Sequence, residues 1–211
     1  MKKKFGKKLP KKFYLRDCVI VAKDLIGKIL VRKKGRRVYA GIIVETEAYK
    51  GSLDSASHSY NGKTKRNEVM FEEGGICYVY FTYGNHYCMN VVTDVKDTAY
   101  AVLIRALEPV EGIEQMKKNR NTMNIYNLTN GPGKLTKAFE IDKKLNGASF
   151  RGKELYICEP VEPGNYKIVV SKRIGISKNV DKLWRYIAAD NPFVSRVNIK
   201  SILKKQKNIN K

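Results

Sequence analysis

Short apolar runs separated by Gly, Asn, Asp and Lys dominate the pattern of hydrophobic positions along this chain. Runs rich in Val, Ile, Tyr and Phe that end in turn residues are typical of β-strands. Gly35 lies between charged neighbours, and Tyr83-Gly84-Asn85 separates two such runs, so both predict tight turns between antiparallel strands. We expect strands at residues 29–31, 38–49, 76–82, 86–92, 99–107, 154–158 and 166–170, with a last one near 184–186.

A helical pattern interrupts the strands at three places. Asp17 can cap a helix that ends at Gly27. A second helix is expected to begin at Pro109 and to end near Arg120, and a short third one to cover residues 135–139. This order of elements predicts an α+β fold: a single domain with a curved, predominantly antiparallel β-sheet flanked by helices.

The length and composition suit one folded domain with basic ends. The chain has 211 residues, of which 43% are hydrophobic, enough for one substantial core. Residues 1–12 carry seven lysines and no acid, and residues 200–211 carry five lysines and no acid. We therefore expect a flexible N-terminal arm (1–12), a single domain (13–199) and a basic C-terminal tail (200–211).

The charge balance points to a polyanionic partner. Lys and Arg number 42 against 20 Asp and Glu, which gives a formal net charge of +22, well beyond what solubility requires. The alternative is a lysine-rich composition that raises surface charge without a function, because lysine is readily tolerated on surfaces. The sequence has no run of eighteen apolar residues, and its basic start is not followed by an apolar signal region. We therefore expect an intracellular protein without a membrane segment.

The cysteines and histidines argue against a metal or another cofactor. The cysteines are scattered in apolar or aromatic runs without paired metal-ligand spacing, and we expect reduced core residues. A zinc site would have to be assembled from distant single ligands. The residues concerned are Cys18, Cys77, Cys88, Cys158, His58 and His86.

Two carboxylates and a ring share one face of the long predicted strand. Side chains alternate along a strand, so Glu45, Glu47 and Tyr49 point to the same side. The carboxylates would be roughly 7 Å apart, within the range spanned by paired glycosidase carboxylates. Spacing alone favours a solvent-facing strand edge with charged side chains, because acidic residues are mostly exposed.

A glycine-rich turn precedes the third predicted helix. The Gly131-Pro132-Gly133-Lys134 segment could present backbone amides to a DNA phosphate. Its spacing is not that of a nucleotide-triphosphate loop, and a plain turn is an equally good interpretation.

Several ordered blocks carry a family resemblance. They are Val44-Glu45-Thr46-Glu47-Ala48-Tyr49, Ala56-Ser57-His58-Ser59, Arg66-Asn67, Met70-Phe71, Tyr78-Val79-Tyr80-Phe81-Thr82-Tyr83-Gly84, Cys88-Met89-Asn90, Val102-Leu103-Ile104-Arg105-Ala106-Leu107-Glu108-Pro109, Gly131-Pro132-Gly133-Lys134-Leu135, Arg173-Ile174-Gly175-Ile176 and Pro192-Phe193-Val194-Ser195. Through them residues 13–196 resemble the alkyladenine (3-methyladenine) DNA glycosylase family. The resemblance implies excision of alkylated or deaminated purines from double-stranded DNA, in base excision repair, by a monomeric enzyme without cofactors.

The resemblance also implies roles for individual residues. Glu47 would be the general base that activates water, and Tyr83 would enter the minor groove in place of the flipped base. The base pocket would be formed by Tyr49, His58, Tyr80, Asn90 and Arg105, with Asn90 excluding guanine by its amino group. Arg66 and Lys134 would contact the DNA backbone. From the residues themselves, Tyr80 could instead belong to the core, His58 to the surface, and Arg105 to an ion pair with Glu108.

The sequence also suits two alternative functions, and it departs from the family pattern at two positions. A bifunctional glycosylase/lyase would use a pocket lysine to form a Schiff base, but no lysine lies in the matched pocket blocks. A non-enzymatic binder of RNA or DNA would not need Glu45 and Glu47 beside the rings. Lys65 and Asn85 replace residues that other members carry in the loop and at the hairpin tip, which leaves the lesion preference open.

Overall fold

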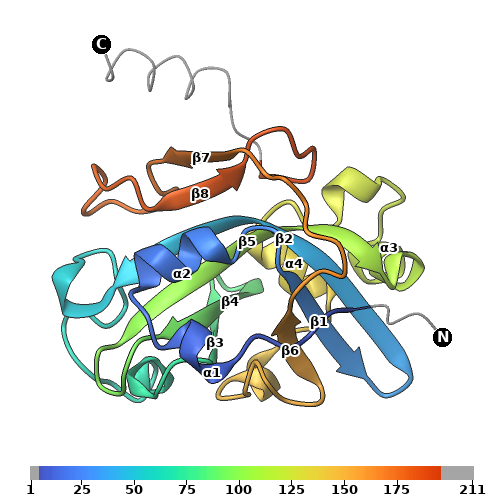
Figure 1. Ribbon diagram of the computed structural model, residues 1–211. Helices are drawn as coiled ribbons and strands as arrows, with labels where there is room; N and C mark the ends of the chain where they lie inside the picture. Colours follow the sequence, from blue (N-terminus) through green and yellow to red (C-terminus); the bar gives the residue numbers. More distant parts are fainter. Residues whose placement is uncertain (1–4, 196–211) are drawn as a thin grey trace, which may run out of the picture.

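The structure is a computed structural model that describes residues 5–195 (Figure 1). Within these residues eight strands form one curved sheet, and every pairing is antiparallel. The strand order is β3-β4-β5-β2-β1-β6, with β8 against β2 and β7 against β8. The strands are β1 (Ile29–Lys34), β2 (Arg37–Lys50), β3 (Cys77–Thr82), β4 (His86–Thr93), β5 (Tyr100–Glu111), β6 (Leu155–Cys158), β7 (Ile168–Ser171) and β8 (Arg185–Ala188).

Short helices complete this α+β domain, as the sequence pattern predicts. The α-helices are α1 (Lys11–Tyr14), α2 (Cys18–Asp24), α3 (Ile113–Arg120) and α4 (Pro132–Ala138), and the 3-10 helices are η1 (Gly51–Leu53), η2 (Glu68–Phe71), η3 (Ile125–Asn127) and η4 (Lys143–Leu145). The side chain of Asp17 accepts from the N–H of Val19 and caps α2, as expected. No helix in residues 5–195 is long and apolar enough to cross a membrane.

The long strand β2 changes its neighbour part-way along one edge. From Arg37 to Ile42 this edge pairs with β1, and from Glu45 to Glu47 it pairs with β8, while β5 follows the other edge. The register against β5 shifts on both sides of Glu45. Such irregularities bend a strand and redirect its side chains, so they suit the place where two carboxylates are buried.

The two faces of β2 have different environments, as the predicted alternation requires. Val44 and Ala48 belong to the main hydrophobic core. Between them, the Thr46 hydroxyl donates to the carbonyl oxygen of Ala22 in α2, at 2.7 Å. Glu45 and Glu47 lie on the opposite face and are completely buried, so the interpretation as a solvent-facing strand edge is wrong. On this second face the N–H of Ile174 contacts Glu47, and Arg185 and Ser195 contact Glu45.

The start of the second predicted helix is wrong by four residues. Pro109 lies within β5, opposite Gly41, where the register between β2 and β5 shifts. A proline has no N–H for the ladder, and a bulge is one of the places where a sheet tolerates it. The helix α3 begins after Gly112, whose φ of 79° lies in the left-handed region, and it ends at Arg120 as expected.

Two further boundaries differ from the predictions. The helix α4 begins at Pro132, so most of the glycine-rich tetrad forms its first turn rather than a loop before it. Within the expected flexible arm, Leu9 is buried and its N–H donates to the carbonyl of Ile157 in β6, so this part of the arm is fixed to the sheet. The expected tail at residues 200–211 lies outside the described residues.

Candidate active site

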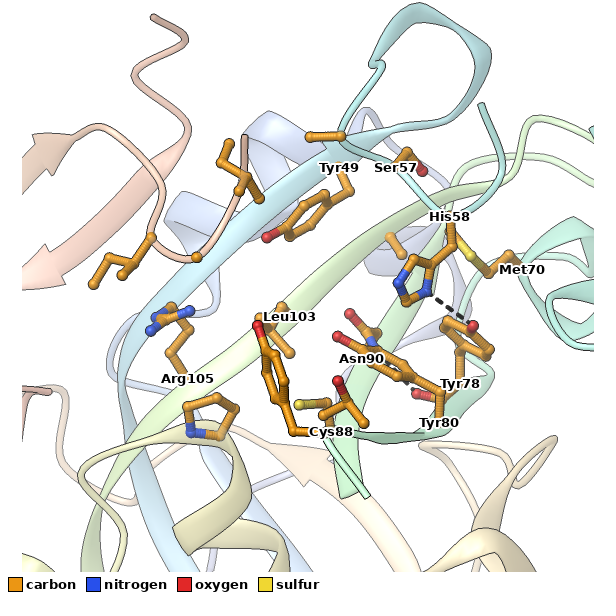
Figure 2. Close-up of a pocket in the computed structure, with 18 of the residues that line it drawn as sticks. Tyr49, Ser57, His58, Met70, Tyr78, Tyr80, Cys88, Asn90, Leu103 and Arg105 are labelled. Atoms are coloured by element: carbon orange, nitrogen blue, oxygen red, sulfur yellow. Dashed lines mark hydrogen bonds between the residues drawn. The ribbon is translucent and has the colours of Figure 1, made fainter. Parts of the chain in front are cut away.

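A cavity of about 270 Å³ opens at one face of the sheet and is lined by residues from β2, β3, β4 and β5 (Figure 2). Tyr49 and Arg105 stand on one side of it, and His58 and Tyr78 stand on the other. The volume lies just below the usual range of about 300–1,000 Å³ for small-molecule sites. A cavity of this size accepts one small, flat group.

Aromatic rings form part of the walls. The rings of His58 and Tyr80 meet edge to face, with centroids 4.5 Å apart, and Tyr80 stacks on Tyr78 at 5.4 Å. Nδ1 of His58 shares a hydrogen bond of 3.1 Å with the Tyr78 hydroxyl. Although His58 has an exposed edge at the cavity mouth, burial among these rings lowers its pKa, and Arg66 lowers it further. His58 is therefore a neutral imidazole at pH 7.

Tyr49 joins the ring wall to the carboxylate of Glu47. The Tyr49 hydroxyl donates to Oε2 of Glu47 at 3.0 Å. Burial raises the pKa of Tyr49 well above its ordinary value, and the negative charge of Glu47 raises it further. The phenol consequently keeps its proton and remains a hydrogen-bond donor to Glu47.

Glu47 lies one layer behind the cavity wall. Its Oε1 accepts the N–H of Ile174 at 2.8 Å, and its Oε2 accepts from Tyr49 and from Nη1 of Arg105, at 3.2 Å. Glu47 is fully buried and is itself absent from the cavity lining, whereas Tyr49, Arg105 and Ile174 all line it. A carboxylate can accept about four hydrogen bonds, so three donors leave capacity for one more.

Glu45 is buried to the same extent but is bound on every side. It accepts from Nε of Arg105 at 2.9 Å, Nε of Arg185 at 2.8 Å, the N–H of Ser195 at 2.7 Å and the Ser195 hydroxyl at 2.8 Å. Burial alone would raise the pKa of the Glu45 carboxyl, yet Arg185, Arg105 and Ser195 hold it below its ordinary value. Three of these four hydrogen bonds end on Oε1, and the fourth, from the N–H of Ser195, ends on Oε2.

Arg105 bridges the two carboxylates from β5. Its Nε and Nη1 donate to Glu45 and Glu47, and these two charges raise its pKa against the lowering effect of burial. The buried salt bridge suggested for Arg105 is confirmed, but its partners are Glu45 and Glu47 rather than Glu108, which accepts from Nδ2 of Asn191 at 2.6 Å. The pleat explains this: Arg105 points to the face where Glu45 and Glu47 lie.

The remaining sequence-derived candidates occupy different parts of the site. Asn90 is buried in the cavity wall, and its Nδ2 donates to the Tyr78 carbonyl at 3.2 Å. Tyr83 stands at the rim, 79% exposed, with a φ of 50° at the tip of the β3–β4 hairpin. Arg66 is exposed, with its guanidinium carbon 6.0 Å from the centre of the Tyr80 ring. Outside the cavity lining, Lys134 donates to Asn127 and Asn130 at 2.5 and 2.8 Å, so it braces a loop.

Several residues of the site were not predicted from the sequence. Asp54 and Arg173 form a fully buried ion pair beside Tyr49, and Arg185 and Ser195 hold Glu45. Arg173 and Ser195 lie in matched blocks, but nothing indicated their contacts, because contacts across more than a hundred residues leave no local pattern. All four cysteines are buried, as expected, and residues 5–195 contain no group of three or more His, Cys, Asp and Glu able to hold a metal ion.

The family model described as methylpurine-DNA glycosylase (MPG) matches residues 12–192 of this chain. Curated relatives named "Putative 3-methyladenine DNA glycosylase" are similar over most of its length. The relative from Prosthecochloris aestuarii is 51% identical over 187 residues, 88% of this chain and 90% of the relative. The one from Carboxydothermus hydrogenoformans is 51% identical over 189 residues, 89% and 98% of the two chains.

A buried carboxylate behind a cavity with aromatic side chains suits a hydrolase that acts on a flat base, and the matches show the family. The chain belongs to the methylpurine-DNA glycosylase family. It is accordingly a DNA glycosylase, an enzyme of DNA repair that hydrolyses the N-glycosidic bond between a base and its sugar. Its macromolecular substrate is DNA, which agrees with the net charge of +22.

Proposed function

We propose that this protein excises alkylated or deaminated purines, 3-methyladenine and hypoxanthine among them, after flipping the damaged base out of double-stranded DNA. The reaction is a monofunctional hydrolysis in which Glu47 activates water, and it leaves an abasic site. One observation carries the proposal: a cavity of about 270 Å³ with aromatic walls lies one residue layer from a fully buried carboxylate. The cavity can hold a flat base, and the carboxylate can activate the water that acts as nucleophile.

The contacts of Glu47 support its role as general base. Arg105, Tyr49 and the N–H of Ile174 fix both oxygens, and one accepting position is left for a water molecule. A carboxylate near the anomeric carbon deprotonates that water and stabilises the positive charge that develops on the sugar. Because Glu47 lies behind the cavity wall, the sugar has to approach between Tyr49 and Ile174.

The ring walls supply affinity for a flipped purine. Stacking on aromatic side chains contributes roughly 1–3 kcal/mol per base, and an alkylated, positively charged purine gains further attraction from the ring faces of Tyr49 and Tyr80. Asn90 stands in the wall, where its buried amide excludes the extra amino group of guanine. His58 reads an edge of the base as a neutral imidazole.

Tyr83 and basic residues around the cavity hold the DNA. The exposed Tyr83 ring enters the minor groove and fills the gap that the flipped base leaves. Arg66 contacts the backbone near the mouth, and Lys134 does so from the first turn of α4. The domain at residues 13–199 acts as an intracellular monomer, and the lysine-rich segments at 1–12 and 200–211 extend its basic surface.

The cavity chemistry favours water over a lysine nucleophile. None of the described residues that line the cavity is a lysine, whereas a bifunctional glycosylase/lyase needs an amine there. The two fully buried carboxylates also argue against a binder without catalysis, because a surface built only for phosphates would not hold negative charge beside its rings.

The test is excision from methylated duplex DNA followed by alkali cleavage at the abasic sites. We expect the native protein to produce breaks and Glu47→Gln to lower the single-turnover rate by about 100- to 10,000-fold, the usual contribution of a general base, with lesion-duplex affinity retained. Borohydride should trap no covalent complex. Full activity of Glu47→Gln, or a trapped complex, would overturn the mechanism, and an inactive native protein would overturn the proposed function.

A further inference from the structure

Arg173 lies at the centre of a buried polar cluster between β2 and the segment that precedes the last strand. Its Nη1 and Nη2 donate to the two oxygens of Asp54, at 2.5 and 2.9 Å, and both side chains of this ion pair are completely buried. Nη1 also donates to the carbonyl of Ala48 at 2.9 Å, and Nη2 to that of Asn179 at 3.3 Å. The guanidinium thereby ties three separate stretches of chain together.

The same guanidinium touches the ring wall of the cavity. Its central carbon lies 4.6 Å from the ring centre of Tyr49 and 5.1 Å from that of Trp184. Ala48, whose carbonyl accepts from Arg173, is the residue between Glu47 and Tyr49 in β2. Arg173 therefore restrains both the backbone and the ring of the strand segment that carries the proposed general base.

A second route from Arg173 reaches Glu47 through the backbone. The next residue, Ile174, donates its N–H to Oε1 of Glu47 at 2.8 Å. The side chain of Arg173 anchors this segment, while Ile174, Gly175 and Ile176 continue along the cavity wall. Any shift of the guanidinium displaces a donor of Glu47 and the face of Tyr49 at the same time.

The stability of the fold does not by itself account for this arrangement. A buried ion pair loses much of its hydration, and well-packed apolar residues of the same shape are often equally stable or more stable. Asp54 is nevertheless provided with further donors, namely Nδ2 of Asn179 at 3.0 Å and the N–H of Ala56 at 3.1 Å. Directional contacts of this kind fix geometry, which an apolar pair cannot do as precisely.

We infer that Arg173, held by Asp54, is a positioning residue for base excision: it sets the Ile174 N–H against Glu47 and the Tyr49 ring against the flipped base. This inference rests on the proposed function. Arg173 contacts Tyr49 and Ala48, and it acts on the reaction through them and through the adjoining Ile174 N–H. Displacements of about 1 Å in such supports can cost about 100-fold in rate.

The test separates positioning from folding with three variants. Arg173→Lys keeps the charge but loses the two-pronged contact with Asp54, and the double variant Asp54→Leu/Arg173→Met replaces the pair by apolar side chains. Arg32→Met is the matched control, because Arg32 is also a buried arginine but lies in β1, outside the cavity lining. For each, the single-turnover excision rate, the affinity for lesion-containing duplex and the midpoint of thermal unfolding are measured on the full chain.

We expect both Arg173 variants to lose about 10- to 100-fold in excision rate, and to lose less in lesion-duplex affinity than in rate, because the other rings of the cavity still hold the base. Arg32→Met should lower the unfolding midpoint and leave the rate of the folded protein unchanged. The inference is overturned if folded Arg173→Lys and the folded double variant excise within about threefold of the native rate, or if Arg32→Met loses as much. An inactive native protein would instead refute the proposed function, so the two failures are distinguishable.

Discussion

Two carboxylates on one face of β2 are equally buried but differ in what surrounds them. Glu45 is bound by two arginines and by two donors of Ser195, and three of these four hydrogen bonds end on Oε1. Two residues further, Glu47 has three donors, and all three come from residues that line the cavity. Burial therefore does not distinguish Glu45 from Glu47, the proposed general base. Nearness to the cavity does, because Arg185 and Ser195, which bind Glu45, do not line the cavity.

Substitution of Glu45 is the strongest way to test this difference. Glu45→Gln removes the negative charge that pairs with both Arg185 and Arg105. Breaking a buried ion pair typically lowers the free energy of unfolding by about 3–5 kcal/mol. Glu47→Gln should cost less stability, because Arg105 keeps its contact with Glu45. Urea unfolding of both variants at pH 7 measures the two free energies. Equal losses, or a larger loss for Glu47→Gln, would contradict a structural role specific to Glu45.

Acid titration sharpens the same comparison. Glu45 and Asp54 both have pKa values held below the ordinary range, so their contribution to stability is complete above the unfolded pKa of about 4 and is lost as the pH falls through the folded pKa. We expect the free energy of unfolding to decrease below about pH 4, and less steeply in Glu45→Gln than in the native protein. Urea unfolding between pH 7 and pH 3 measures it. Parallel curves for the two proteins would show that Glu45 does not contribute to the acid sensitivity.

The smallest expected change in stability comes from Tyr83 at the rim of the cavity, away from both carboxylates. Tyr83 has a φ of 50°, a conformation that costs a non-glycine residue about 1 kcal/mol, so Tyr83→Gly should keep or raise stability by up to about that amount. It should also weaken binding to lesion-containing duplex, because the ring is lost. Tyr83→Ala, which keeps the strain, is the matched control. If Tyr83→Gly is stable and binds lesion-containing duplex as tightly as the native protein, the proposed insertion of Tyr83 into the minor groove is refuted.

The sequence predicted the fold better than it predicted the contacts of the site. Alternation placed Glu45, Glu47 and Tyr49 on one face, and turn residues located the hairpin at Tyr83, because both depend on near neighbours. The strand through Pro109 was missed, since an irregularity in β5 beside Pro109, which arises in its pairing with β2, allows the proline there. Spacing alone suited an exposed edge for the carboxylates, and the family resemblance supplied the expected roles.

The contacts that hold the carboxylates could not be read from the sequence. Asp54 and Arg173 are 119 residues apart, and Glu45 and Ser195 are 150 residues apart. Long-range ion pairs of this kind have no periodicity, because only the folded sheet brings their partners together. The direct role of Glu47 was likewise expected at the cavity surface, whereas the side chain lies behind Tyr49 and Ile174.

The pairing of β2 with β8 has a consequence for biosynthesis. Arg185 and Ser195, which bind Glu45, follow it by 140 and 150 residues in the sequence and are therefore synthesised long after it. Until β8 has been made, Glu45 has Arg105 as its remaining arginine partner, and the edge of β2 from Glu45 to Glu47 lacks its neighbouring strand. The strand segment that carries both carboxylates thus reaches its final surroundings only after residue 195 has been added.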